Sequence, residues 1–183
     1  MRFTRYCRSI LFTPALAADR FARGQQSGAD ISLVDLEDSV SPAHKDAARQ
    51  RAEAFFSAPP SACRRAVRIN SVTHHEGLKD LLALRSYPVK PDVVMVPKVE
   101  SPRDLEIVEQ SLGPDCAHMD LMAIVETARG LENVNAISCS ISAPSSGDGG
   151  GPTEGEPLLE HLELPTQALK RAPARGPPQR AWC

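Results

Sequence analysis

Short apolar runs alternate with longer amphipathic stretches over the first three quarters of the chain. The apolar runs predict five strands, at Ser9 to Thr13, Ile31 to Leu36, Ala66 to Asn70, Val93 to Lys98 and Leu121 to Glu126. The amphipathic stretches predict five helices, at Leu16 to Gln26, Ala47 to Phe56, Glu76 to Tyr87, Ser101 to Leu112 and Thr127 to Ile137. This alternation is typical of βα units on a parallel sheet, so we predict an α/β fold with about five such units.

Local signals mark several of the predicted boundaries. Gly28 stands where a glycine commonly ends a helix before the next strand. Ser41 followed by Pro42 predicts an N-cap and a first helical residue. Ser101 with Asp104 resembles a capping box. These signals place helix starts after the second and the fourth strand.

The first residues allow a second interpretation. Three arginines precede the apolar run Ile10 to Phe12, as basic residues precede the apolar part of a signal peptide. The run is short, however, and Thr13-Pro14 interrupts it. This favours a first strand over a signal peptide.

The character of the sequence changes near Cys139. Thirteen of the last forty-five residues are Pro or Gly, a proportion typical of low-complexity sequence. We therefore predict one folded domain over residues 1–137 and a disordered, Pro/Gly-rich tail over residues 138–183.

Composition excludes several classes of function. The formal net charge is −2 over 183 residues, with acids and bases interspersed, so no nucleic-acid-binding or basic membrane-binding face is predicted. No apolar run approaches the roughly 18 residues of a membrane span. The five cysteines include no C-x-x-C pair, which argues against a disulfide framework and a zinc site and fits a reducing, cytoplasmic location. Small molecules and other subunits are the expected partners.

Polar side chains recur two residues apart where the predicted strands end. The pairs are Asp35 and Glu37, Arg68 and Asn70, and Lys98 and Glu100, and Glu126 closes the fifth strand. Residues two apart on a strand point to the same face, and the carboxyl ends of barrel strands carry the active site. Strands also end in charged residues because the chain returns to solvent, but this does not account for in-phase pairs on several strands. The pattern favours a functional site.

Five segments together resemble the motifs of a known family. They are RSILFTP at Arg8 to Pro14, GADISLVDLEDSVSP at Gly28 to Pro42, VRIN at Val67 to Asn70, VPKVES at Val96 to Ser101 and IVETARGL at Ile124 to Leu131. In order and spacing they resemble the HpcH/HpaI aldolase and citrate-lyase beta-subunit family. The resemblance implies a TIM (β/α)₈ barrel, incomplete here because such a barrel usually needs about 250 residues. It also implies Mg²⁺-dependent cleavage or formation of carbon–carbon bonds beside a carbonyl group, commonly in acyl-CoA thioesters.

The resemblance carries roles to individual residues. It implies that Glu126 binds Mg²⁺ and contacts the substrate, that Arg68 grips a substrate carboxylate, and that Glu37 and Asp38 are the catalytic carboxylates beside Asp35. The residue types suit these roles, because Mg²⁺ prefers oxygen ligands and a guanidinium grips a carboxylate at two points. We expect cleavage of citryl-CoA or a malyl-CoA-like ester to acetyl-CoA and an oxo acid such as oxaloacetate, by a chain that is a homo-oligomer if it folds.

Lys98 has two interpretations. A Schiff-base role is conceivable for a lysine at a strand end. Because the resemblance implies metal catalysis, an ion pair with a neighbouring carboxylate is the favoured interpretation.

The sequence departs from the family after Ile137. A second metal-binding aspartate is expected after a sixth strand, in a motif that resembles F-G-x-x-D-L, and Asp148 in its Gly-rich run does not match it. Two hypotheses follow from this departure. The chain is either a Mg²⁺-dependent lyase or a truncated, catalytically impaired relative that serves only as a binding or subunit-interaction module.

Overall fold

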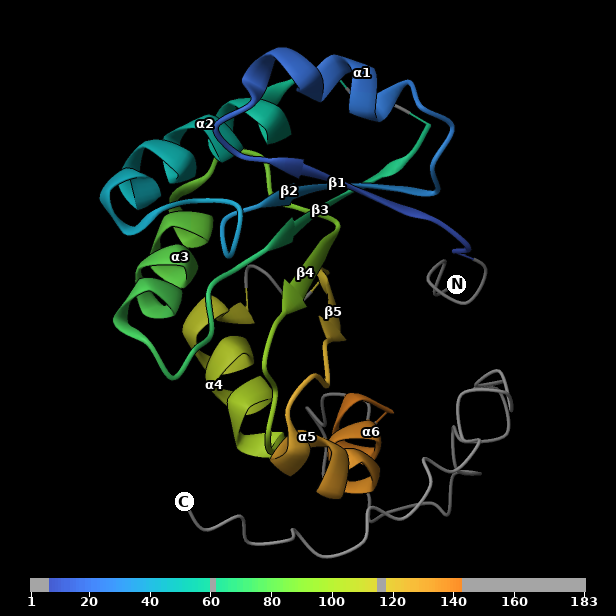
Figure 1. Ribbon diagram of the computed structural model, residues 1–183, viewed down its shortest axis with the longest axis vertical. Coiled ribbons are helices and arrows are strands. Elements are labelled where there is room, and N and C mark those ends of the chain that lie inside the picture. The colour runs from blue at the N-terminus through green and yellow to red at the C-terminus, as the bar shows by residue number, and fades with distance from the viewer. Residues whose placement is uncertain (1–6, 60–61, 115–117, 143–183) are drawn as a thin grey trace, which may run out of the picture. The chain divides into compact units, whose positions relative to one another are not determined.

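In a computed structural model of the protein, five strands lie side by side in the order in which they follow one another along the chain (Figure 1). They are β1 (Ile10–Pro14), β2 (Ile31–Asp35), β3 (Arg64–Arg68), β4 (Val93–Val96) and β5 (Asp120–Ala123). Every neighbouring pair is parallel. The structure describes residues 7–59, 62–114 and 118–142, all of which belong to one compact unit. The predicted parallel βα arrangement is confirmed.

Helices follow each of the strands. They are α1 (Phe21–Gln25), α2 (Lys45–Ser57), α3 (His75–Ser86), α4 (Pro102–Leu112), α5 (Ala128–Glu132) and α6 (Val134–Ser142), with short 3-10 turns at Ala18–Arg20 and Pro42–His44. In Figure 1, α2, α3 and α4 follow one another beside the sheet. Parallel strands in sequential order with helices outside them form the wall of a (β/α)₈ barrel, so the described residues make up part of such a barrel.

The two faces of the sheet differ in what they pack against. The main apolar core lies between the helices and the sheet, where Phe55 and Phe56 of α2 and Leu84 of α3 are all at most 1% exposed. A smaller cluster of Ile31, Leu33, Ala66, Val93 and Met95 occupies the other face. That second face corresponds to the inside of a barrel, and its side chains alternate along each strand with those of the main core.

Three of the predicted helices agree with the structure to within two residues at each end, and the other two are divided into two elements. The predicted helix from Leu16 to Gln26 is a 3-10 turn followed by the five residues of α1. The predicted helix from Thr127 to Ile137 is divided at Asn133 into α5 and α6, and α6 continues to Ser142. Periodicity detected both segments, but apolar spacing alone does not show where a 3-10 turn precedes a helix or where a helix is interrupted.

The helix-start signals had mixed outcomes. The capping box of Ser101 and Asp104 is present at the start of α4. Ser41, in contrast, makes no capping hydrogen bond to the backbone; its hydroxyl lies 2.7 Å from Nδ1 of His44, and α2 begins only at Lys45, after the 3-10 turn. Gly28 adopts a positive φ of 81°, as expected of a glycine after a helix.

The predicted tail lies largely outside the described residues. Its first part belongs to α6, which passes the predicted boundary at residue 137. The interpretation of residues 143–183 as a disordered tail stays a prediction. Within the described ranges, no helix combines the length and apolarity that crossing a membrane requires.

Candidate functional site

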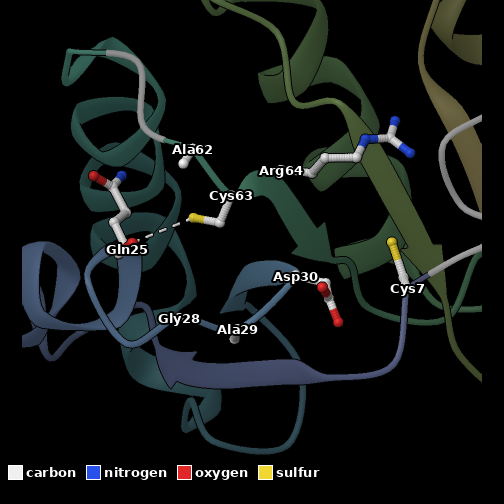
Figure 2. Close-up of a pocket in the computed structure, with 8 residues that line it drawn as sticks. All are labelled: Cys7, Gln25, Gly28, Ala29, Asp30, Ala62, Cys63 and Arg64. Atoms are coloured by element: carbon white, nitrogen blue, oxygen red, sulfur yellow. Dashed lines mark hydrogen bonds between the residues drawn. The ribbon is translucent and has the colours of Figure 1, made fainter.

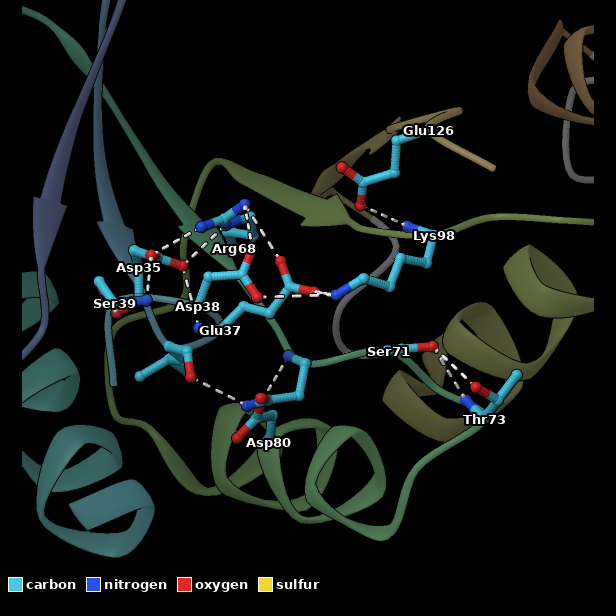
Figure 3. A network of polar contacts seen from close by, with 12 residues as sticks. Asp35, Glu37, Asp38, Ser39, Arg68, Ser71, Thr73, Asp80, Lys98 and Glu126 are labelled. Carbon is cyan, nitrogen blue, oxygen red and sulfur yellow. Dashed lines mark hydrogen bonds and ion pairs between the residues drawn. The ribbon is translucent and has the colours of Figure 1, made fainter. Parts of the chain in front are cut away.

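Six ionisable side chains meet where strands β2 to β5 end (Figure 3). We call them the mouth cluster: Asp35, Glu37, Asp38, Arg68, Lys98 and Glu126. The ends of four parallel strands supply them, because in a sequentially ordered sheet all carboxyl ends lie at the same edge. The four residues predicted as site residues, Glu37, Asp38, Arg68 and Glu126, all belong to this cluster.

Asp35 and Arg68 form its central ion pair. They are opposite one another in the register of β2 and β3. Arg68 donates from Nε and Nη2 to the two oxygens of Asp35, each over 2.7 Å. Burial would raise the pKa of Asp35, which is 3% exposed, but the hydrogen bonds from Arg68, Ser39 and the Glu37 backbone outweigh it and lower that pKa. Asp35 is therefore a carboxylate anion in the folded protein.

The same carboxylate organises the loop after β2. The backbone N–H of Glu37 donates to Oδ1 of Asp35 over 2.9 Å, and that of Ser39 donates to Oδ2 over 3.2 Å. Asp35 thus holds both the guanidinium and the loop that carries Glu37 and Asp38. Its role in the structure is to orient its neighbours.

Glu37 lies between the two cations of the cluster. Its Oε1 is 2.5 Å from Nζ of Lys98, and its Oε2 is 3.1 Å from Nη1 of Arg68. The residue is 4% exposed, and Oε2 is buried without a well-aligned hydrogen bond. Asp38 is different, because its side chain is 68% exposed and lies 3.6 Å or more from both cations. The loop after β2 therefore carries one enclosed carboxylate, Glu37, and one that is open to solvent, Asp38.

Lys98 connects three strand ends. Its backbone N–H donates to Oε1 of Glu126 over 3.1 Å, and its ammonium reaches Glu37. The hydrogen bond to Glu37 raises the pKa of Lys98, which keeps the amine protonated and unsuited to Schiff-base formation. The predicted ion pair is thus confirmed. Lys98 also has a φ of 53°, a left-handed conformation that is uncommon for a residue with a Cβ.

The prediction that each pair of polar residues shares one face is wrong for two of the three pairs. β3 ends at Arg68, so Asn70 is no longer in the pleat and turns to the helix side, where it contacts Lys45 and Asp80. Glu100 follows β4 by four residues, and its carboxylate lies 3.7 Å from Arg129. Alternation with period two holds only while the strand continues.

A second set of polar residues lies behind the strand ends, and the sequence did not reveal it. We call it the helix-side network: Lys45, Arg49, Asn70, Glu76 and Asp80. Arg49 of α2 donates to Asp80 of α3 over 2.7 Å, and Asp80 accepts from both the backbone and the side-chain amide of Asn70.

Gly77 allows α3 to approach this closely. A Cβ there would overlap the carbonyl oxygen of Ser71. A signal for the network did exist in the sequence, because Asp80 occupies the apolar face of α3 with Gly77, Leu81 and Leu84.

A hollow of about 350 Å³ lies at the opposite end of the strands (Figure 2). Cys7, Asp30, Cys63 and Arg64 contribute to its lining. It contains no residue of the mouth cluster and none of the residues predicted as site residues.

The charge of the mouth cluster favours a bound cation. Four carboxylates face two cationic side chains, which leaves two formal negative charges. Carboxylate oxygens are the ligands that Mg²⁺ prefers, and one or two of them with water complete its shell. Glu126 is exposed, and its carboxylate is of the donor type that fits Mg²⁺, whereas both oxygens of Glu37 already face the cations Arg68 and Lys98. The described residues hold no group of three or more His, Cys, Asp or Glu arranged to bind a metal.

Similar proteins are known among characterised sequences. The chain is 38% identical over 137 residues to a citrate lyase subunit beta-like protein of Mycobacterium tuberculosis, with 75% of this chain and 44% of the relative covered. It is 33% identical over 132 residues to a (3S)-malyl-CoA thioesterase of Cereibacter sphaeroides, covering 72% and 44%. It is 30% identical over 140 residues to the mitochondrial citramalyl-CoA lyase of Homo sapiens, covering 71% and 40%. The chain thus spans less than half the length of these relatives.

Solved structures resemble the fold as well. RipC from Yersinia pestis matches with a TM-score of 0.61 and 36% identity, over 75% of this chain and 54% of that one. The citrate lyase beta subunit of M. tuberculosis complexed with oxaloacetate and magnesium matches with a TM-score of 0.59 and 34% identity, covering 74% and 55%. The CitE protein of the same organism in complex with magnesium, acetoacetate and coenzyme A gives 0.59 and 34%, covering 74% and 46%.

A family profile also matches the chain, over residues 8–143, a range that includes all five strands and the whole mouth cluster. This range is well over half of the sequence. The chain belongs to the HpcH/HpaI aldolase/citrate lyase family.

Proposed function

We propose that the chain carries the site of a Mg²⁺-dependent carbon–carbon lyase that acts on a 3-hydroxyacyl-CoA of the citryl-CoA or malyl-CoA type. The observation that supports it best is the surplus of carboxylates beside Arg68 at the ends of four parallel strands. The family contains lyases of CoA esters, and relatives have been solved with magnesium, oxaloacetate and coenzyme A. Acetyl-CoA and an oxo acid are the proposed products.

Each residue of the mouth cluster has a place in this proposal. Arg68 carries a charge that can attract the carboxylate of an oxo acid, and Asp35 fixes its plane through two hydrogen bonds. Asp38 is open to solvent and accepts the proton of the substrate hydroxyl. Glu37 is the second catalytic carboxylate of the proposal and lies between Arg68 and Lys98.

The electrons of the broken O–H bond form the new carbonyl group, and those of the broken carbon–carbon bond pass to an enolate of the thioester. The proton that Asp38 accepted then passes to the enolate carbon, which completes acetyl-CoA and restores the carboxylate. A Mg²⁺ ion held by Glu126 and water would act as the Lewis acid for the developing oxyanion. The cations Arg68 and Lys98 add fixed positive charge beside that oxyanion.

The assay measures acetyl-CoA release from citryl-CoA and from malyl-CoA, with and without Mg²⁺. We expect Mg²⁺-dependent turnover, slower than that of a full-length relative, because the described residues hold no complete set of metal ligands. Glu126→Gln should remove the response to Mg²⁺, and Arg68→Ala should lower kcat/KM by roughly 100-fold, as expected when a charge-assisted contact is lost.

Arg85→Ala is the matched control, because Arg85 is exposed near the end of α3 and should leave turnover unchanged. Turnover that persists in Glu126→Gln would show that Glu126 is not the Mg²⁺ ligand. Turnover as fast as that of a full-length relative would contradict the expected impairment.

A second function has an observation in its favour. The described residues lack a group of three ligands, and the chain matches 40–44% of the length of its curated relatives. A chain that binds an oxo acid or another subunit without turnover would fit these facts. In that case calorimetry would detect oxaloacetate binding that Arg68→Ala abolishes, while no acetyl-CoA forms under any condition.

A further inference from the structure

We propose that Lys45 is a positioning residue of the mouth cluster. It fixes the loop that carries Glu37 and Asp38 from the helix side of the sheet. The inference rests on the proposed function, since it assigns a task to a residue that never touches the substrate. It comes from a buried ammonium group that the proposed chemistry leaves unused.

The contacts of Lys45 all lie on two strand ends. Its Nζ donates to the carbonyl oxygens of Leu36 and Glu37, each over 2.7 Å, and to Oδ1 of Asn70 over 2.6 Å. Asn70 in turn donates from Nδ2 to the same Leu36 carbonyl over 3.0 Å. Two donor groups, the ammonium of Lys45 and the amide of Asn70, thereby hold the loop after β2 through three hydrogen bonds.

Glu37 is held from both sides as a result. Its backbone carbonyl accepts from Lys45 on the helix side, while its carboxylate contacts Arg68 and Lys98 in the mouth. A displacement of this backbone would move the carboxylate away from both cations. Misplacement of a catalytic group by about 1 Å can cost about 100-fold in rate.

Lys45 is anchored by residues that do not reach the mouth. Asn70 is fixed by Asp80 through hydrogen bonds of 2.7 and 2.6 Å, and Asp80 is fixed by Arg49 over 2.7 Å. Lys45, Asn70 and Asp80 are 9%, 7% and 1% exposed. The anchor is therefore enclosed and tightly packed, as a support for a precise loop should be.

Packing alone does not account for a lysine at this position. Burial of an ammonium is costly, and burial lowers the pKa of Lys45 even though Asp80 and other carboxylates oppose it. An apolar side chain would fill the same space without that cost. What it could not do is satisfy two consecutive carbonyl groups of the Leu36–Glu37 loop.

The test compares Lys45→Met and Lys45→Gln with Lys90→Met in the full chain. Lys90 is a matched control, because its ammonium also has three acceptors, the carbonyls of Leu84, Arg85 and Tyr87, at the end of α3 remote from the mouth. Lys45→Gln keeps one donor group and protects the test against a Met variant that folds poorly.

Amide hydrogen exchange is the first readout. The N–H groups of Glu37 and Ser39 report on the loop, because both donate to Asp35. In Lys45→Met their exchange should accelerate at least about tenfold, whereas Val67 and Val94 in the central strands should change less than about threefold. Lys90→Met should leave the loop amides unchanged. Unchanged loop amides in Lys45→Met, equal acceleration at all four positions, or failure of both Lys45 variants to fold would each overturn the proposal.

Turnover is the second readout and separates this inference from the proposed function. Where the unaltered chain releases acetyl-CoA, Lys45→Met should lower kcat by about 10- to 100-fold and change KM much less. A chain without any turnover contradicts the proposed function, and hydrogen exchange then decides the role of Lys45 by itself.

Discussion

The mouth cluster and the helix-side network lie back to back at the ends of β2 and β3, and they differ in charge balance and in exposure. In the mouth, four carboxylates face two cations, and the side chains of Lys98 and Asp38 are 44% and 68% exposed. In the helix-side network, Lys45 and Arg49 balance Glu76 and Asp80. Residues of similar type therefore form an unbalanced, partly exposed group on one side and a neutral, enclosed group on the other.

This difference indicates how each group contributes to the protein. A balanced buried network gains little over apolar packing but becomes costly when one partner is removed. A group with unequal numbers of positive and negative charges at the ends of strands is less stable, because its carboxylates repel one another. The same surplus gives it affinity for a cation or a polar ligand. The helix-side network should therefore govern stability, and the mouth cluster should govern binding.

The largest effect should come from Asp80→Ala. It removes the most deeply buried of the carboxylates that pair with Arg49 and the acceptor of two hydrogen bonds from Asn70. We expect the free energy of unfolding to fall by about 3–5 kcal/mol, as for other broken buried pairs. Urea unfolding at neutral pH measures it.

Glu106→Ala is the control for that experiment, because Glu106 forms an exposed pair with Arg103 on α4. It should change the free energy of unfolding by no more than about 0.5 kcal/mol. Equal losses for the two variants would show that the buried network contributes no more to stability than an exposed surface pair.

A smaller effect should appear in acid. The hydrogen bond from Arg49 lowers the pKa of Glu76 from 4.5 to about 2. Because the folded pKa is the lower one, this stabilisation is complete above pH 4.5 and is lost as the pH falls toward 2. Glu76 is partly exposed, so solvent screening reduces the contribution to about 1 kcal/mol.

Urea unfolding of the unaltered chain and of Glu76→Gln between pH 2 and pH 7 tests this. The difference in stability between them should be greatest above pH 4.5 and shrink in acid. A difference that stays constant over this range would contradict the assigned partner.

The smallest effect on stability should come from the mouth. Asp38→Asn removes one surplus negative charge from an exposed position. We expect the free energy of unfolding to change by less than about 0.5 kcal/mol, while Mg²⁺ binding weakens. Calorimetric titration with MgCl₂ beside urea unfolding checks both. A loss of stability comparable to that of Asp80→Ala would show that the mouth is a structural ion-pair group.

The sequence predicted the strands at Ile31–Asp35 and Val93–Val96 well, because both are buried along their whole length. It placed the third strand two residues too late, because β3 begins with the charged residues Arg64 and Arg65. It also predicted the meeting of Glu37 with Arg68, since both follow from strand ends at one edge of a sheet. It did not predict Lys45, because a charged residue near the start of a helix ordinarily faces solvent. Its burial depends on Asn70, twenty-five residues further along the chain.

For a related reason, the sequence could not show which residues of the polar pairs belong to the mouth cluster. Whether Asn70 joins the mouth depends on where β3 ends, and a shift of one or two residues reverses the face. The roles of Glu37, Asp38, Arg68 and Glu126 in binding and catalysis remain predictions that the proposed experiments address.

The left-handed backbone of Lys98 costs stability at a position whose side chain the proposed chemistry uses. Glycine adopts a φ of 53° without a steric penalty, whereas a residue with a Cβ gives up about 1 kcal/mol there. A selection for heat resistance alone would therefore favour glycine at position 98, and it would discard the ammonium that meets Glu37. Variants collected under thermal selection and under catalytic selection should diverge first at this residue.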